Sequence, residues 1–416
     1  MPDLKRYIYL RAARTALYAM YVCRCFMHAL KRLSHNPKSI VFYLEDESLY
    51  HHDDGMGRYV YLLLNKFSQA GYNVYFYKNA DTFKKYLDLG KYGRFIYSIP
   101  NLKMISEIPE QLSVPETQFA FDTINTHLLD KKWKKLIYVN ICKPTLCQVG
   151  EMIWIPYSFH PTAYKSGIDR AIGKLRNNGR KLKIIFVGNS VAKGYSLKRL
   201  KDWYNKLTRH EGIKTVLEIS DKVKNVENSD QFRKMVNESN YINECRLLRT
   251  DRATKLHVRD YWNIISRSDF FLALSGTDYP MCHNTIESMA VGTIPIMGYG
   301  EWFFPPLEHG KNVIIYSDEK DLKAKVHDVL NMDAQAIKKM RNNVIEYYEK
   351  YLTSESFVGK VEAIHDKVMT LMLHPCLVCA PQEDEAGKQF MRELILQVDG
   401  MTNDAKSHGK AESPVL

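Results

Sequence analysis

The chain has 416 residues and a mass of 48.4 kDa, which exceeds one ordinary compact core and suits two domains. Hydrophobic residues make up 45% of it and charged residues 25%, a composition that excludes a disordered or fibrous chain. The 59 Lys and Arg outnumber the 47 Asp and Glu, so the net charge of +12 favours a polyanionic partner: nucleic acid, anionic lipid or a phosphorylated substrate. Eight scattered Cys with a single CxxC, at 376–379, indicate reduced thiols, a reducing cytosolic compartment and no metal site.

Residues 1–36 predict a basic amphipathic helix. Apolar residues recur at steps of three and four from Ile8 to Leu30, and no acidic residue lies between Lys5 and Arg32. The longest uncharged run is far shorter than the roughly 20 residues that span a bilayer. We therefore expect peripheral attachment to the anionic, cytoplasmic face of a membrane; the alternative is a helix packed on its own domain.

Residues 37–168 predict a first α/β domain. Its strands are expected at 39–44, 73–77, 94–99, 118–121 and 136–139. Between the first two, apolar residues at helical spacing predict a helix that ends at Gly71. A strand, a helix and a strand at this spacing form a βαβ unit, which implies a parallel sheet.

Residues 169–340 predict a second α/β domain, after a polar segment at 170–181 that we interpret as a linker. A helix is expected at 196–208, and strands at 182–187, 215–219, 244–248, 270–274 and 293–297. Closing helices are expected over 341–380, with helical pattern from Asp333 to about Met372, and a tail over 381–416. The fold class is therefore α/β, with two Rossmann-like domains in succession.

The strongest chemical signal is the run at 275–297. A strand is expected to end at its start, and a new helix to open near 283–285 with Glu287 in its first turn. The N-terminus of a helix binds phosphate, and a carboxylate beside it can accept hydrogen bonds from two adjacent hydroxyls of a ribose or sugar. The alternative is that Glu287 only completes a helix cap. The residues that would bind a donor here are Ser275, Gly276, His283, Asn284, Thr285 and Glu287.

The run at 283–296 resembles the donor-site signature of GT-B glycosyltransferases, including their exostosin-like and retaining groups. The resemblance extends to 186–189, which is similar to their opening strand and phosphate loop, and to Gly55 and Gly57, which are placed like their glycine-rich loop. It implies two Rossmann-like domains facing a cleft and a closing C-terminal helix around 347–351. We expect a nucleotide sugar as co-substrate and neither a metal nor another cofactor.

Transfer from a nucleotide sugar must stabilise a departing phosphate, and cations and helix N-termini do so electrostatically. Loops that follow strands of the second domain supply Gly188, Asn189, Ser190 and Lys193 for donor binding, and Arg249 and Arg252 for catalysis with Glu287. For Lys193, a solvated surface charge is an equal alternative.

In the first domain, Asp54 or one of the neighbouring His residues is expected to act as a base for an acceptor hydroxyl, and we assign Asp54 to this role. The residues expected to contact the acceptor are His51, Gly55, Gly57 and His160. Adjacent His and Asp residues also suggest a metal, but neighbouring side chains of an extended chain point apart, so we expect acceptor contacts instead.

These observations favour a glycosyltransferase that extends a cell-surface glycan, of polysaccharide or lipopolysaccharide type, on a glycan or lipid-linked acceptor. One alternative is a transferase of the Kdo type with a CMP-linked donor. Another is a non-catalytic, two-lobed protein that binds a nucleotide or glycan. Nucleic acid is excluded as a partner because no recognised binding motif accompanies the dispersed basic residues.

Overall fold

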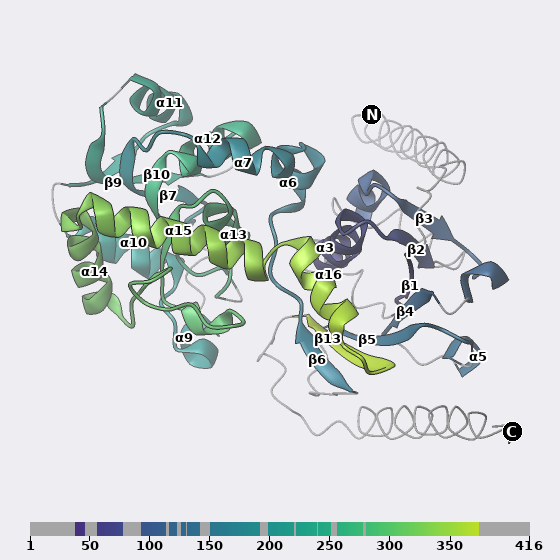
Figure 1. The fold of residues 1–416 in the computed structure, drawn as a ribbon. Helices are drawn as coiled ribbons and strands as arrows, with labels where there is room; N and C mark the ends of the chain where they lie inside the picture. The colour runs from purple at the N-terminus through teal and green to yellow at the C-terminus, as the bar shows by residue number, and fades with distance from the viewer. Residues whose placement is uncertain are drawn as a thin grey trace, which may run out of the picture. The chain divides into compact units, whose positions relative to one another are not determined.

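The computed structural model describes residues 38–45, 56–77, 93–113, 116–122, 126–129, 131–141, 150–191, 199–219, 222–238, 240–250, 256–277 and 280–373. The described residues up to Ile155 form one compact unit with those from Val358 onward, and Pro156–Phe357 form a second. Each unit is built on its own parallel sheet (Figure 1). This confirms the predicted α/β class of two Rossmann-like domains, the architecture of GT-B proteins. The expected N-terminal helix and the C-terminal tail lie outside the described residues.

Unit 1 contains a seven-stranded sheet in the order β3-β2-β1-β4-β5-β13-β6, in which neighbouring strands are parallel. The strands are β1 (Ser39–Tyr43), β2 (Asn73–Tyr77), β3 (Leu102–Ile105), β4 (Thr117–Phe121), β5 (Lys135–Ile141), β6 (Glu151–Trp154) and β13 (Val368–Leu373). Every residue of β1 and β4 is buried, as expected for strands in the interior of a parallel sheet.

The helical elements of unit 1 are α3 (Met56–Gln69), η1 (Gly93–Ser98), η2 (Glu110–Ser113), α5 (Thr126–Leu129) and most of α16 (Ser354–Ala363). The predicted helix before Gly71 is α3, and Gly71 reverses the chain at a φ of 86°. The strand predicted at 94–99 is wrong, because this segment is the 3₁₀ helix η1. Its polar groups bond locally: Ser98 Oγ donates to the carbonyl of Phe95 at 2.6 Å.

The C-terminal part of unit 1 also differs from the prediction, since helices were expected up to Met372. The helix α16 ends at Ala363, and Val368–Leu373 form β13 between β5 and β6, so pairing with two neighbours overrides the local helical pattern. Two side chains tie α16 to the sheet. Lys135 Nζ donates to the carbonyls of Val361 and Ile364 at 2.6 Å, and Glu362 accepts from Lys38 and from Tyr72 at 2.7 Å.

Unit 2 contains a six-stranded sheet in the order β12-β11-β10-β7-β9-β8, again with parallel neighbours. Its strands are β7 (Leu182–Gly188), β8 (Val223–Val226), β9 (Ile242–Arg249), β10 (Ser268–Leu272), β11 (Ile294–Met297) and β12 (Ile314–Ile315). From β7 the chain first builds β8 and β9 on one side and then β10, β11 and β12 on the other. The strand order therefore reverses between β7 and β10, where open α/β sheets bind ligands at the carboxyl ends of their strands.

The helical elements of unit 2 are α6 (Pro161–Lys165), η3 (Ile168–Ala171), α7 (Ile172–Arg176), α9 (Arg199–Tyr204), α10 (Arg209–Leu217), α11 (Ser229–Glu238), α12 (Val258–Ser266), α13 (His283–Ala290), η4 (Gly300–Trp302), α14 (Glu319–Asn331) and α15 (Ala334–Tyr351). We predicted a domain boundary at 168/169 and a linker at 170–181. In the structure unit 2 begins at Pro156, and η3 and α7 occupy most of the segment predicted as a linker. No helix of the described segments combines the length and apolar character that crossing a bilayer requires.

Two predictions near α10 need correction. Only Arg199–Tyr204 of the helix expected at 196–208 is helical among the described residues: Asn205 adopts a φ of 51° after α9, and Thr208 accepts a hydrogen bond from the amide of Glu211 and caps a new helix, α10. The strand expected at 215–219 is the C-terminal part of that helix. Thr215 and Val216 are β-branched but lie on its buried face, and the strand begins only at Val223.

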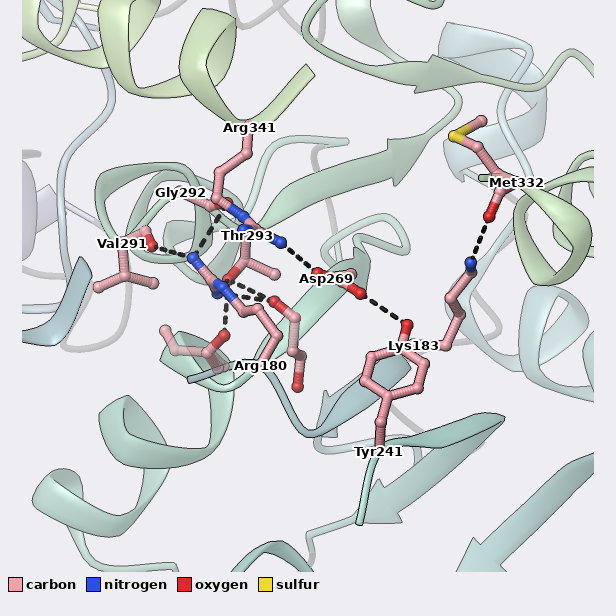
Figure 2. Close-up of polar contacts among 11 residues, drawn as sticks. Arg180, Lys183, Tyr241, Asp269, Val291, Gly292, Thr293, Met332 and Arg341 are labelled. Atoms are coloured by element: carbon pink, nitrogen blue, oxygen red, sulfur yellow. Dashed lines mark hydrogen bonds and ion pairs between the residues drawn. The ribbon is translucent and has the colours of Figure 1, made fainter. Parts of the chain in front are cut away.

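A buried polar cluster lies at the start of β10, and Figure 2 shows its contacts. Asp269 accepts from the Tyr241 hydroxyl at 2.6 Å and pairs with Arg341 of α15. Beside it, Arg180 donates to the carbonyl of Val291 at 2.9 Å, at the C-terminal end of α13, and to Thr293 Oγ1 at 3.0 Å. These contacts fix the C-terminal end of α13 and the entry into β11.

Candidate functional site

The carboxyl ends of β7 and β9 lie side by side in unit 2. Gly188 pairs with Arg249 in the sheet, and the amide of Thr250 donates to the carbonyl of Gly188 at 2.9 Å. Beyond the strand, Arg249 Nε donates to Ser190 Oγ at 2.8 Å. Ser190 is buried whereas Arg249 is exposed. The structure thus brings together two residues predicted to bind the donor, Gly188 and Ser190, and one predicted to be catalytic, Arg249.

A buried cation, Arg209, joins this loop to the neighbouring strand end. Its guanidinium group donates to the carbonyls of Asn189 and Ser275 and to Cys282 Sγ, each at 2.9 Å. Only 3% of the residue is exposed. Arg209 therefore fixes the segments that follow β7 and β10 and the residue that precedes α13. Sequence reasoning missed it, although the capping pair Thr208 and Glu211 signals that a helix begins at this position.

The N-terminus of α13 opens beside this guanidinium group. Its N-cap residue, Cys282, makes no side-chain capping bond to the helix, because its sulfur accepts from Arg209 instead. Before it, the amide of Gly276 donates to the carbonyl of Pro280 at 3.0 Å and folds the loop back. The first amides of a helix have no partner within the helix, so this end carries a partial positive charge. Arg209 and α13 together form a positively charged end of the sheet.

Glu287 lies one turn deeper in α13 than predicted. The helix begins at His283, directly after Cys282, so Glu287 is its fifth residue and belongs to the second turn. The residue is 2% exposed, and its carboxylate accepts from the backbone amide of His160 at 2.9 Å. Burial and the adjacent Glu287 carboxylate raise the pKa of the Tyr261 hydroxyl well above its ordinary value, and Arg209 acts in the opposite direction. Anionic and cationic groups therefore lie in one buried neighbourhood.

His160, predicted to contact the acceptor, lies beside α13 of unit 2. Its ring nitrogen Nδ1 is 2.7 Å from Thr162 Oγ1 and caps α6, and the ring centroid is 4.9 Å from that of His283. Deeper in α13, Thr285 Oγ1 and the Tyr299 hydroxyl are hydrogen bonded at 2.9 Å. His160 thus contacts two residues of α13, His283 and Glu287.

Five predicted site residues lie outside the described residues, namely His51, Asp54, Gly55, Lys193 and Arg252. Gly57 is the second residue of α3. Within the described segments, no group of three or more His, Cys, Asp or Glu side chains has the arrangement of a metal site. The groups brought together in unit 2 can bind an anion at the end of α13 and neighbouring hydroxyls at Glu287.

No protein-family model matches the chain. No curated protein sequence matches it either. Among solved structures, the N-terminal domain of a Candida albicans trehalose-6-phosphate phosphatase is similar, with 8% identity over 80% of this chain and 97% of that chain, at a TM-score of 0.41. HepE of Anabaena in complex with UDP has 12% identity over 78% and 98%, at 0.40, and sucrose-phosphate synthase of Thermosynechococcus elongatus has 10% over 78% and 97%, at 0.38. Likeness at this level carries no statement on activity.

Proposed function

We propose that the chain is a glycosyltransferase that binds a nucleotide-sugar donor in unit 2. The observation that carries this proposal is the combination at the strand-order reversal: the buried Arg209 and the N-terminus of α13 beside the buried carboxylate of Glu287. A nucleotide sugar presents an anionic diphosphate next to a ribose with two adjacent hydroxyls. Along α13, the site offers positive potential for the diphosphate at the N-terminus and then a buried carboxylate for the ribose hydroxyls.

The positive groups support the leaving-group step. When the glycosyl bond breaks, negative charge develops on the departing phosphate, and fixed donors stabilise it most where water is excluded. The first amides of α13 and the guanidinium group of Arg209 would stabilise the charge of the departing phosphate. Arg249 at the end of β9, whose Nε donates to Ser190 Oγ, would stabilise the same charge. We assign Arg252 and Lys193 to the same role on the basis of their places in the sequence.

Glu287 would hold the nucleoside. A carboxylate offers about four acceptor positions, so it can retain the amide of His160 and also accept from ribose hydroxyls. Hydrogen bonds to a charged acceptor contribute about 1.5–3 kcal/mol each. Since Arg180 fixes the other end of α13, the carboxylate is held in position before a ligand arrives.

We further propose that the acceptor is a growing surface glycan and that unit 1 binds it. His51, Asp54 and Gly55 follow β1 in the sequence, and strand order in unit 1 reverses between β1 and β4. Residues 1–36 would hold the enzyme reversibly to the cytoplasmic face of a membrane, near lipid-linked acceptors. Co-sedimentation with anionic vesicles tests this: deletion of residues 1–35 should abolish binding, and unchanged binding contradicts it.

A donor screen by mass spectrometry tests the activity. UDP-, GDP- and CMP-linked sugars are incubated with the wild type, with Glu287→Gln and with Glu218→Gln, an exposed glutamate of the same unit. We expect hydrolysis or transfer of one donor class by the wild type and the control, and strongly reduced turnover by Glu287→Gln. A CMP-linked donor would select the Kdo-type alternative. Tight nucleotide binding without turnover of any donor would favour the non-catalytic binding protein instead.

A further inference from the structure

Asn284, the second residue of α13, carries a buried oxygen atom that the folded chain leaves unsatisfied. The residue is 6% exposed, and its side-chain oxygen Oδ1 has no hydrogen-bond partner among the described residues. The nearby hydroxyl of Thr285 bonds to Tyr299, so the next residue of the helix is satisfied whereas Asn284 Oδ1 is not.

Such an oxygen is uncommon, because a buried amide oxygen without a donor loses its hydration and gains nothing in return. Other buried polar atoms of unit 2 that lack a partner include Arg341 Nε, whose guanidinium group still pairs with Asp269 through its other nitrogens. Asn284 has no comparable compensation at its carbonyl oxygen. Each such group needs an explanation, and at the candidate site a bound ligand can supply the missing donor.

The position of Asn284 restricts the chemistry of that donor. Asn284 and Glu287 are three residues apart, so their side chains leave the same face of α13, with Asn284 nearer the positive end. A phosphate at that end has only acceptor oxygens at neutral pH and cannot donate to a carbonyl. The donor is therefore another group of the ligand, and in a nucleotide sugar the hydroxyls of the ribose and of the sugar lie nearest to the diphosphate.

We propose that Asn284 Oδ1 accepts a hydrogen bond from a hydroxyl of the bound nucleotide sugar. This inference rests on the proposed function and gives one atom of its site a defined partner; only a contact with the transferred sugar would also make Asn284 a specificity residue. The hydroxyl belongs either to the ribose or to the transferred sugar. In both cases the amide oxygen is satisfied only in the complex, so Asn284 contributes to binding and not to the stability of the free protein.

Two substitutions of Asn284 separate a binding role from a structural one. Asn284→Ala removes the unsatisfied oxygen and introduces a better helix former, and Asn284→Leu does so while keeping the side-chain branching. Both variants should unfold at the wild-type temperature or above it. Their affinity for the nucleotide sugar should fall about tenfold, the loss expected for one hydrogen bond at a binding site.

Asn312→Ala is the matched control. Asn312 is also buried, at 4% exposed, but its Oδ1 accepts from the amide of Glu308 at 2.8 Å. Its removal leaves that amide without an acceptor, so we expect a lower unfolding temperature and unchanged nucleotide-sugar affinity. The two asparagines thus predict opposite results in the same two measurements.

The experiment is titration calorimetry and thermal unfolding of the full-length variants. The probes are UDP-glucose, GDP-mannose and a CMP-linked sugar, each with its free nucleotide. Weaker binding of both the nucleotide sugar and its free nucleotide supports contact with the ribose, and weaker binding of the nucleotide sugar alone supports contact with the transferred sugar. Wild-type affinity in both Asn284 variants, or a loss of stability with retained affinity, overturns the inference while the proposed function stands. A wild type that binds none of the probes overturns both.

Discussion

Substitution of Glu287 by Gln or by Ala should separate the two tasks of its carboxylate. Gln retains an oxygen that can accept from the amide of His160, at present 2.9 Å away, and it has nearly the same shape. Glu287→Gln should therefore unfold close to the wild-type temperature. It lacks the negative charge, so each hydrogen bond from a ribose hydroxyl should weaken. The expected loss of about 1.5–3 kcal/mol corresponds to roughly 10- to 100-fold lower nucleotide affinity.

Glu287→Ala should lose stability as well as affinity. The amide of His160 would remain partly buried without an acceptor, at a cost of about 1–3 kcal/mol. For a unit of this size, each kcal/mol lowers the unfolding temperature by roughly 2–4 °C. The Ala variant should therefore unfold roughly 2–12 °C lower, whereas the exposed control Glu218→Gln should change neither quantity.

Titration calorimetry and differential scanning calorimetry measure the two effects on the same samples. Nucleotide affinity in Glu287→Gln equal to that of the wild type would refute the assignment of the carboxylate to the ribose. A large drop in the unfolding temperature of Glu287→Gln would refute the argument that its oxygen replaces the carboxylate toward His160.

Three further predictions follow from other contacts. Arg209→Lys keeps the positive charge but loses the planar guanidinium group, so the affinity for UDP should fall by about tenfold or more while the affinity for uridine changes little. Titration calorimetry with both ligands checks this, and equal losses of affinity for both would indicate that the fold of the site is damaged. Arg249→Ala should lower kcat more than it raises the acceptor KM, and steady-state kinetics that show a change in acceptor KM alone would contradict the assigned role. Burial opposes ionisation of Glu362, but hydrogen bonds from Lys38 and Tyr72 hold its pKa below the ordinary 4.5. The stabilisation by the ionised carboxylate is therefore present at neutral pH and is lost as the pH falls through the lowered pKa. The difference in unfolding free energy between wild type and Glu362→Gln should therefore shrink between about pH 6 and about pH 3, and a constant difference would contradict this reasoning.

The sheets were largely predictable because both are parallel and buried. β1, β2 and β7 appear in the sequence as mainly apolar runs bounded by polar turns, and β4 as a shorter apolar run at its end. Prediction failed where residue type and local structure disagree. Thr215 and Val216 are typical of strands but lie in α10. The apolar segment Val368–Leu373 forms a strand because it pairs with β5 on one side and β6 on the other, which no local pattern reveals.

The candidate site was predictable where its residues lie at or just after the end of a strand. Ser190, Arg249 and Ser275 could be placed near one another from the strands alone, because parallel strands end at one edge of a sheet. The position of Glu287 was one turn wrong because Cys282, and not a later residue, precedes the first turn of α13. Arg209 was missed because the reach of its side chain across the sheet depends on tertiary packing that no local pattern encodes.

The placement of β13 sets an order for the maturation of this protein on the ribosome. β13 fills the position between β5 and β6, yet the whole of unit 2 is synthesised after β6 and before β13. Unit 2 has all of its strands in one continuous stretch, so it can fold as soon as Phe357 has emerged. Until Val368–Leu373 follow, β6 has no neighbour and β5 presents an unpaired edge, the kind of surface that other chains can join. A polypeptide released before Val368 would therefore contain a complete unit 2 and an incomplete unit 1 that is prone to aggregation.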